Sequence, residues 1–354
     1  MKLTTKYVGL DVHQATTSVA VREENDRVIA TTVLPTEPAV LVEYFRGMRG
    51  SVHVAFEEGT QAQWLHDLLE PVVTRVVVCD RRGESKRGNK GDAVDAAQLS
   101  AWLRQGRLRA VYHGSGDRAK LKELGRAYRN IVEDATRVRL RLKAVFRARG
   151  IKTTGRSVYD PTKRVEWLAK LTEPGAHFRA ELLYGELSVL QQLHPRAKAA
   201  FLAEARRDPS WRVLQTVPFL GPIRVALLLA SLQTPRRFRT KRQLWAYAGL
   251  AVVTRTSAEY EVDGGRPRRR RRPPMTRGLN RNHNPVVKNV LKGAATAAAS
   301  RPGALRDFYQ HMLKDGMREE LARVTLARKL AAIILRLWKT GAHYDSTQLT
   351  VQAG

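Results

Sequence analysis

The first 80 residues alternate between apolar and polar positions in short runs, a pattern that predicts β-strands. Residues 51–57 show it most clearly, with Val52, Val54 and Phe56 on one face and Glu57 on the other. Strands are expected at residues 6–12, 16–23, 27–34, 51–57 and 72–79, and helices at residues 40–46 and 61–69. Three strands therefore come first, and strands that alternate with helices follow them.

A run rich in Ala, Gln and Leu follows a basic loop and predicts a helix that begins at Asp92. Asp92 and Asp95 are three positions apart, so both carboxylates lie on one face near the first turn. The positive end of the helix dipole tolerates negative charge there. An isolated pair of this kind is usually a capped helix start, and its meaning depends on the rest of the chain.

Beyond residue 110 the apolar residues recur at helical spacing. Arg118–Arg149 carries them near heptad positions, while its other faces are rich in Arg and Lys. Phe178–Arg207 shows a second long helical pattern, so the two segments are expected to form an antiparallel hairpin or coiled coil. Such a hairpin serves for oligomerisation, for contact with RNA or DNA through its basic face, or for both, and the sequence favours neither role over the other.

The last third of the chain is predicted to be mainly helical, with one β-rich stretch at Val252–Val262. Residues 213–230 predict a helix, a tight turn at Gly221-Pro222 and a second helix. This arrangement resembles a helix-hairpin-helix, whose turn amides can face a phosphate, although a plain helical turn explains it equally well. We therefore expect three domains, at residues 1–110, 111–208 and 209–345.

The charge of the chain indicates a polyanionic partner. Its 354 residues include 63 Lys and Arg but only 33 Asp and Glu, which gives a formal net charge of +30. Nucleic acid is the commonest polyanion that binds such proteins. A membrane is not expected as a partner, because no apolar run reaches the roughly 20 residues of a spanning helix. The single cysteine, Cys79, is interpreted as a buried thiol at a strand end and suits a cytoplasmic, nucleoid-associated protein.

Basic residues are concentrated between Gly264 and Arg306, where the sequence contains no Asp or Glu. Each Arg that neutralises a phosphate releases counterions, so this segment is expected to bind nucleic acid. A solvated basic tract or a localisation-like run is the alternative interpretation. The candidate contacts are Arg266, Arg268, Arg269, Arg270, Arg271, Arg272, Arg277 and Arg281.

Four acidic residues follow the order that is typical of an RNase H-like sheet. Asp11 ends the first strand, Glu57 ends the fourth strand, and Asp92 and Asp95 begin a later helix. Two Mg²⁺ ions about 3.5–4 Å apart, or Mn²⁺ in their place, clamp the attacking and leaving oxygens of a phosphodiester. Magnesium takes oxygen ligands, so four carboxylates suffice without Cys or His. The alternative ligands, should one of the four be wrong, are Glu58 and Asp80.

Six segments together carry a family resemblance. The acidic ones are Gly9-Leu10-Asp11-Val12-His13, Phe56-Glu57-Glu58-Gly59-Thr60 and Gly91-Asp92-Ala93-Val94-Asp95-Ala96. The later ones are Val217–Pro222, Tyr247–Leu250 followed by Thr256-Ser257-Ala258, and Gly278–Asn282. In this order they resemble the motifs of the DEDD insertion-sequence transposases, specifically the one-ten family of bridge-RNA-guided recombinases. The resemblance extends over nearly the whole chain.

The resemblance implies an α/β N-terminal domain of RNase H-like (RuvC-like) fold, a helical hairpin and a mainly α-helical C-terminal transposase domain. Asp11, Glu57, Asp92 and Asp95 would hold Mg²⁺, and Ser257 would attack a DNA phosphate and become linked to it. A non-coding bridge RNA would pair with donor and target DNA, and strand exchange would excise and insert the element. The acids and the serine would come from different protomers, in a dimer that forms a tetramer on DNA.

Two other functions are compatible with the same residues. In a metal-dependent nuclease of the RuvC or RNase H kind, water would be the nucleophile and Ser257 a bystander. In a basic scaffold protein, the chain would bind nucleic acid and the acids would be inactive. An isolated serine in a β-rich loop is ordinary surface in most proteins, so the residues alone do not select Ser257.

Overall fold

The computed structural model of the chain separates into two compact units, residues 1–117 and 118–354. Each unit has hydrophobic clusters of its own. The structure describes residues 4–80, 91–114, 118–255, 260–263, 266–269 and 275–347.

The first unit is built on a five-stranded sheet with the order β3-β2-β1-β4-β5. The strands are β1 (Thr5–Val12), β2 (Thr16–Glu23), β3 (Val28–Pro35), β4 (Ser51–Glu57) and β5 (Arg75–Cys79). The first three form an antiparallel meander, whereas β4 pairs with β1, and β5 with β4, in parallel. This mixed sheet is consistent with the RNase H-like fold expected from the sequence, and the strand bounds differ from the expected ones by at most a few residues.

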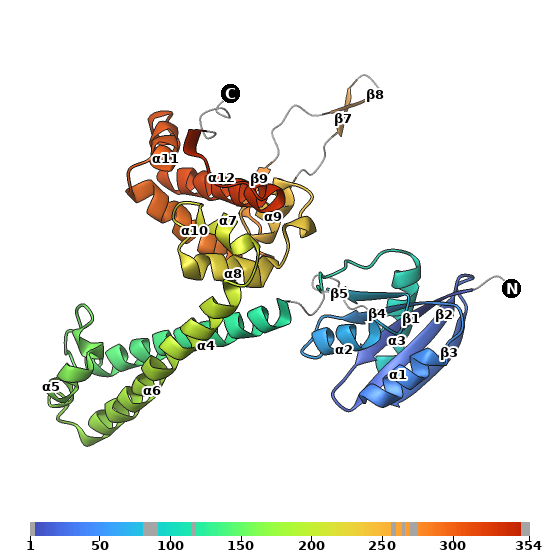
Figure 1. Cartoon of the computed structure of the whole chain (residues 1–354), viewed down its shortest axis with the longest axis horizontal. Helices are drawn as coiled ribbons and strands as arrows, with labels where there is room; N and C mark the ends of the chain where they lie inside the picture. The colour runs from blue at the N-terminus through green and yellow to red at the C-terminus, as the bar shows by residue number, and fades with distance from the viewer. Residues whose placement is uncertain are drawn as a thin grey trace. The chain divides into compact units, whose positions relative to one another are not determined.

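Two helices cover one face of this sheet (Figure 1). They are α1 (Pro38–Arg46) and α2 (Ala62–Leu69), which supply the crossover connections that parallel strands require. Phe45 of α1 and Leu65 of α2 belong to the same buried cluster as Phe56 of β4. The alternation of β4 places its apolar side chains against these helices and turns Glu57 to the other face, as the sequence predicts.

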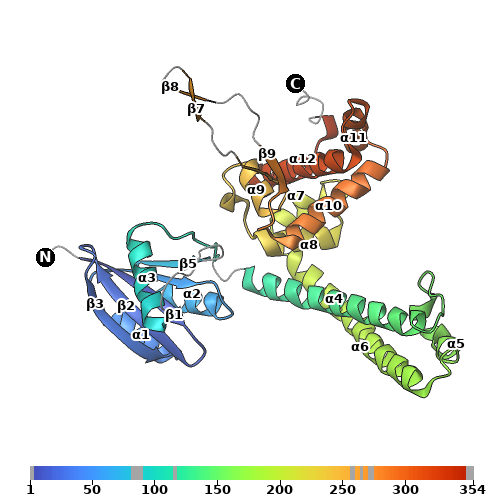
Figure 2. The ribbon, with the colours of Figure 1, turned by 180° about the vertical axis from the view of Figure 1, so that it is seen from behind.

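A third helix, α3 (Asp92–Arg104), covers the opposite face of the sheet and crosses β1 at Gly9 (Figure 2). A Cβ on Gly9 would lie 2.0 Å from the carbonyl oxygen of Ala96, so only glycine allows the helix to approach this closely. Arg22 of β2 holds the same helix, because its Nε donates a hydrogen bond to Ser100 Oγ at 3.2 Å. These contacts fix the first turn of α3 beside the end of β1.

The second unit begins with a long helical hairpin (Figure 1). Its elements are α4 (Ala119–Arg147), η2 (Ser157–Tyr159), η3 (Pro161–Lys163), α5 (Arg164–Leu168) and α6 (Pro174–Ala205). The tip has a hydrophobic cluster of its own, which includes Leu142, Phe146, Trp167 and Leu187. The two long helices lie side by side, as their heptad-like spacing predicts.

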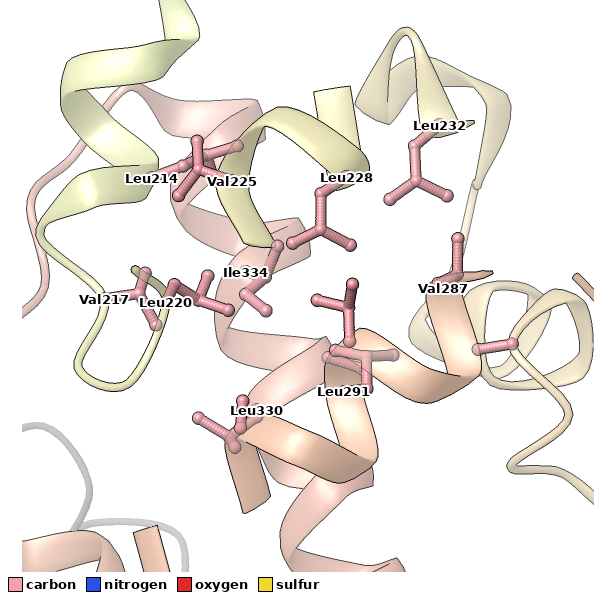
Figure 3. Packing of buried hydrophobic residues seen from close by; sticks show 14 of the residues in the cluster. Leu214, Val217, Leu220, Val225, Leu228, Leu232, Val287, Leu291, Leu330 and Ile334 are labelled. Carbon is pink, nitrogen blue, oxygen red and sulfur yellow. The ribbon is translucent and has the colours of Figure 1, made fainter. Parts of the chain in front are cut away.

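The remaining helices form a compact helical core. They are α7 (Ser210–Gln215), α8 (Pro222–Leu232), η4 (Pro235–Arg237), α9 (Lys241–Tyr247), α10 (Pro285–Ser300), α11 (Ala304–Lys314) and α12 (Glu319–Thr340). Figure 3 shows Leu228, Leu291 and Ile334 meeting inside this core. Leu121 of α4 and Phe201 of α6 join the same cluster. The base of the hairpin and the helical core therefore share one hydrophobic interior, and the division into three domains stays a prediction.

Two short antiparallel ribbons leave the helical core between α9 and α10. In one ribbon β6 (Val252–Arg255) pairs with β9 (Met275–Leu279), and in the other β7 (Tyr260–Asp263) pairs with β8 (Arg266–Arg269). The β-rich stretch expected at Val252–Val262 is thus present in two described pieces.

Cys79 is 1% exposed at the end of β5, which confirms its interpretation as a buried thiol. In the described part of the chain, every helix is too short or too polar to cross a membrane.

Candidate active site

The first acidic residue, Asp11, is the penultimate residue of β1 and projects from the face of the sheet that α3 covers. Its position follows from strand alternation, since Gly9 lies two residues earlier on the same face and touches α3 directly. The neighbouring residues Val8 and Leu10 point to the opposite, apolar face. The strand therefore carries one half-buried carboxylate to the edge of the α3 contact.

Asp92 and Asp95 occupy the first turn of α3, which begins after Gly91 in extended conformation. The amide of Asp95 donates to the carbonyl oxygen of Gly91 at 2.9 Å and closes this turn. Both carboxylates influence Asp11 electrostatically. Asp11 is thus a neighbour of two aspartates that follow it by 81 and 84 positions in the sequence.

His13 joins this group from the end of β1. Its Nε2 lies 3.4 Å from Asp11 Oδ2 and 3.6 Å from Asp92 Oδ1. The ligand atoms of Asp11, His13 and Asp92 all lie within 4.8 Å of one another. Sequence reasoning did not select His13, although its spacing of two from Asp11 was the available signal.

The pKa of Asp11 is raised above its ordinary value of 3.8. Burial is the main cause, because it disfavours the charged carboxylate. His13 lowers the pKa, while the charges of Asp92 and Asp95 raise it further. A cation among these groups would remove the repulsion, so the cluster has the electrostatics of a cation site.

Glu57 is the last residue of β4 and lies on the same face of the sheet as Asp11. In the parallel pairing Leu10 is opposite Phe56, so the next residue of each strand places Asp11 beside Glu57. Two neighbouring strands thus end in carboxylates at one edge of the sheet, under the first turn of α3. The structure therefore brings the ligand atoms of Asp11 and Asp92 together with His13, and it places Glu57 and Asp95 at neighbouring positions of β4 and α3.

The adjacent residue Glu58 has a different environment. Its Oε2 lies 2.7 Å from Nε2 of His113, whose Nδ1 lies 3.1 Å from Oε1 of Gln63. The side-chain amide of Gln63 donates in turn to Asp67 at 2.9 Å, and His113 stacks on His66 with ring centroids 5.4 Å apart. This network holds Glu58 on the side of α2, which favours Glu57 over Glu58 as the acid of the cluster.

Residues 8–148 match the family model of the DEDD transposases of the IS110 type. Residues 211–310 match the model described as the transposase IS116/IS110/IS902 family. The chain belongs to the IS110 family of DEDD transposases. Among proteins of curated function, none matches this transposase.

The family assignment makes the transposase an enzyme that cleaves and recombines DNA, and it implies the use of a divalent metal. The N-terminal match contains all four predicted acids and continues into α4. The C-terminal match contains α8, α10 and both ribbons. The matched regions therefore coincide with the parts of the chain that the sequence analysis selected.

We call Asp11, Glu57, Asp92 and Asp95, together with His13, the acidic cluster. The side chains of this cluster suit a divalent cation. Carboxylate oxygens suit Mg²⁺ and Mn²⁺, and the imidazole of His13 beside them is a ligand type that transition metals also accept. Asp11, with its raised pKa, is a group whose charged form such an ion would stabilise. Asp11, Asp92 and His13 are therefore the candidate ligands that the geometry groups, and Glu57 and Asp95 stay predicted ligands.

The candidate nucleophile Ser257 lies outside the described residues, in the segment between β6 and β7. The base of its ribbon is well anchored in the transposase. Gly249 has a φ of +64°, and a Cβ there would lie 2.5 Å from the ring of His283. Asn280 Nδ2 donates to the carbonyl oxygen of Ala246 at 3.0 Å, which ties the start of the Asn-rich turn to α9.

The predicted basic contacts are partly described. Arg266 and Arg268 of β8 and Arg281 after β9 are exposed. The side chains of Arg269 and Arg277, and the whole of Arg270, Arg271 and Arg272, lie outside the described part of the chain. The turn expected at Gly221-Pro222 is present between α7 and α8, and Arg224 Nη1 closes it by donating to the carbonyl oxygen of Phe219 at 2.7 Å. Its contact with a phosphate stays a prediction.

Proposed function

We propose that the transposase excises and inserts its insertion sequence by RNA-guided strand exchange, with Mg²⁺ at the acidic cluster and Ser257 as nucleophile. The observation that carries the metal part is the meeting of Asp11, Asp92 and His13 within 4.8 Å, beside Glu57 on the neighbouring strand. The serine and the RNA rest on the family resemblance of the sequence motifs.

The acidic cluster would hold two Mg²⁺ ions, which when bound polarise the phosphate and stabilise developing negative charge. The chain itself contributes orientation. Asp11 and Glu57 come from hydrogen-bonded strands, and Gly9 allows α3 to lie close enough to add Asp92 and Asp95. A site built on a sheet and a packed helix holds its ligands more precisely than a site built on loops.

The hydroxyl of Ser257 would attack a DNA phosphorus, forming a phosphoserine ester while the sugar oxygen leaves. The ester conserves the energy of the phosphodiester, so a sugar hydroxyl of the other DNA can later displace the serine without ATP. A free serine hydroxyl is a weak nucleophile and needs activation. The resemblance implies that the acidic cluster of another protomer lies opposite the serine.

Self-association is supported by the hairpin. The outer face of α6 carries Phe178, Leu182 and Val189, whose side chains are 62%, 60% and 56% exposed. Gly185 lies between them, at a position where a Cβ would meet nothing within 4 Å. These residues recur at i, i+4, i+7 and i+11, the spacing of a helix–helix contact. A second copy of the chain is the proposed partner of this stripe, in the dimer and tetramer that act on DNA.

A metal-dependent nuclease with water as nucleophile is the second candidate function. It is favoured by the fact that the acidic cluster alone contains the groups that hydrolysis requires. The two candidates differ in one product, because only the serine mechanism leaves protein covalently attached to DNA.

The test combines excision in cells with detection of that adduct. We expect the wild-type transposase, expressed beside its native element ends, to give the circular excision junction and a DNA–protein adduct that survives denaturation. Ser257→Ala should abolish both, whereas Ser300→Ala, at an exposed serine that ends α10, should retain both. If Ser257→Ala still gives the excision junction, Ser257 is not the nucleophile and the mechanism with water as nucleophile replaces the proposed one.

A further inference from the structure

The helical core of the second unit contains two neighbouring cavities that the predicted acids, serine and Arg run do not explain. The first has a volume of about 390 Å³ and lies between α12, the start of α9 and the segment that follows α12. The second has a volume of about 540 Å³ and lies between α12, η4 and the residues around α7. Lys339 lines both, so the cavities adjoin one another at this side chain.

The first cavity gathers positive charge. Lys241 of α9 and Lys329 of α12 both line it, and so do Arg336 and Lys339 from the last turns of α12. Burial and the charge of Lys241 lower the pKa of Lys329 below its ordinary value of 10.5. Two ammonium groups that repel one another in a concave site indicate a site for an anion. Of the described residues that line this cavity, one is a carboxylate, Asp345.

Apolar side chains lie among these charges. Ala332, Ile333 and Leu337 share one face of α12 with Lys329 and Arg336, and Tyr344 of the following segment completes the lining. Burial raises the pKa of the Tyr344 hydroxyl, so the ring is neutral at physiological pH. A nucleotide joins a flat apolar base to an anionic phosphate, so it matches a site that is lined by both apolar and cationic side chains.

The second cavity continues the positive charge. Arg236 and Arg239 line it and are exposed, and Trp338 lines it as well. The indole Nε1 of Trp338 donates to Ser210 Oγ at 2.7 Å, which fixes the ring. Lys339 Nζ donates to the carbonyl oxygens of Phe238 and Arg239 at 2.5 and 3.3 Å, which holds the wall between the two cavities in place.

We propose that the two cavities bind consecutive nucleotides of an unpaired DNA strand, with phosphates at the Lys and Arg side chains and a base against Ile333 and Tyr344. The proposal deepens the proposed function by assigning a strand-binding site to the helical core. It rests on DNA as the partner of the transposase and is independent of the serine and RNA parts.

The size of the cavities selects an unpaired strand. Their volumes fall within the roughly 300–1,000 Å³ of sites that enclose a small ligand, which is the scale of a single nucleotide. A duplex would touch only the rims, because its bases are stacked and paired inside the helix. Positive charge alone does not distinguish this surface from others in a chain of net charge +30. The concave shape of the two cavities is therefore the feature that identifies them as a binding site.

The experiment measures the binding of the full-length transposase to labelled oligo-dT, to a duplex of equal length and to oligo-rU, at two salt concentrations. The test variant is Arg236→Gln/Lys241→Gln/Lys329→Gln. The matched control, Arg301→Gln/Lys314→Gln/Arg318→Gln, removes the same charge from exposed positions of the second unit outside both cavities.

We expect the test variant to lose about tenfold or more in oligo-dT affinity, and its salt slope to fall by about 2, since each phosphate contact on a single strand contributes roughly 0.7. The control variant should change by less than about twofold, and the duplex should be affected less than oligo-dT. Equal losses in test and control, or equal losses for duplex and oligo-dT, would overturn the proposal. A loss confined to oligo-rU would assign the cavities to RNA and would also overturn it.

A second measurement covers the case in which the test variant does not fold. Wild-type protein is irradiated with an oligo-dT that carries 5-iodouracil, and the cross-linked peptide is identified by mass spectrometry. The expected cross-link is to Tyr344 or Trp338, the aromatic residues that line the cavities. Cross-links only to other parts of the chain would contradict the assignment, whatever the outcome of the excision assay.

Discussion

The acidic cluster of the first unit and the lysine pair of the second unit each hold like charges together in a partly buried place. In the cluster, burial and the neighbouring carboxylates raise the pKa of Asp11. In the pair, burial and Lys241 lower the pKa of Lys329. The opposite directions have the same physical cause, because each fold disfavours the charged form of its own group. Each site is therefore stabilised by a ligand of opposite charge, a cation in one case and a phosphate in the other.

The two regions differ in how firmly the backbone positions the charges. Asp11 and Glu57 are fixed by paired strands, and Asp92 and Asp95 by a helix that touches Gly9. Lys241 and Lys329 instead reach their cavity on long side chains with many rotamers. The acidic cluster is thus preorganised, as a reaction at a single phosphorus atom requires. The two lysine side chains can instead change rotamer and so contact DNA phosphates at slightly different positions.

The largest expected effect comes from Asp11→Asn. We expect excision to fall by about a thousandfold, because loss of a metal ligand removes several kcal/mol of transition-state stabilisation at about 1.4 kcal/mol per tenfold. Thermal unfolding with and without Mg²⁺ is the second measurement. Mg²⁺ should raise the melting temperature of the wild type much more than that of the variant.

Asp11→Asn should cost no stability when metal is chelated. Because the pKa of Asp11 is raised in the folded state, its contribution to stability is present at low pH and lost as pH rises from 3.8 through the raised pKa. Near neutral pH the ionised carboxylate therefore destabilises the folded state, and Asn in its place removes this cost.

Glu58→Gln is the matched control for the excision assay, because Glu58 binds His113. Excision by this variant should stay within about tenfold of excision by the wild type. A thousandfold loss in Glu58→Gln would reverse the assignment of Glu57.

The next effect concerns the close contact that assembles the acidic cluster. Gly9→Ala would place a methyl group 2.0 Å from the Ala96 carbonyl oxygen, so we expect a loss of about 3 kcal/mol in the unfolding free energy of the first unit. Gly47→Ala is the control, because a Cβ there meets its nearest neighbour at an ordinary 3.5 Å. Urea unfolding followed by circular dichroism measures both. Similar stability of the two variants would show that α3 can move away from β1 at little cost.

The smallest expected effect is the pH dependence of the lysine pair. Since the pKa of Lys329 is lowered in the folded state, stability rises as pH increases through that pKa towards 10.5. The stability advantage of Lys329→Gln over wild type should therefore shrink as pH is raised above neutral. Lys314→Gln, at an exposed position of α11, is the comparison. An advantage that is constant with pH would indicate that neither burial nor the charge of Lys241 lowers the pKa of Lys329.

Much of the first unit could be predicted because its signals are local. The alternation of residues 51–57 gave both the strand and its buried face, and the order of strands and acids indicated an RNase H-like sheet. The acids could be chosen because Asp11, Glu57 and Asp92 lie at element ends, where a sheet collects its functional groups.

The parts that escaped prediction depend on contacts between distant segments. The bond between Glu58 and His113 joins residues 55 positions apart, and the sequence offered no signal for it. The cavity that Lys241 and Lys329 share depends on how α9 packs against α12, which residue spacing does not specify. The hollow beside the last turns of α12 likewise depends on the segment that follows this helix, which residue spacing does not place.

The burial of Cys79 gives an experimental advantage. It is the sole cysteine of the chain and only 1% exposed, so a thiol introduced elsewhere would react with a maleimide dye far faster than the native one. A cysteine at the exposed Gln192 of α6 or the exposed Lys314 of α11 could carry a fluorophore without replacement of any core residue. Fluorescence from such labels would follow the hairpin and the helical core separately while DNA is cut and rejoined.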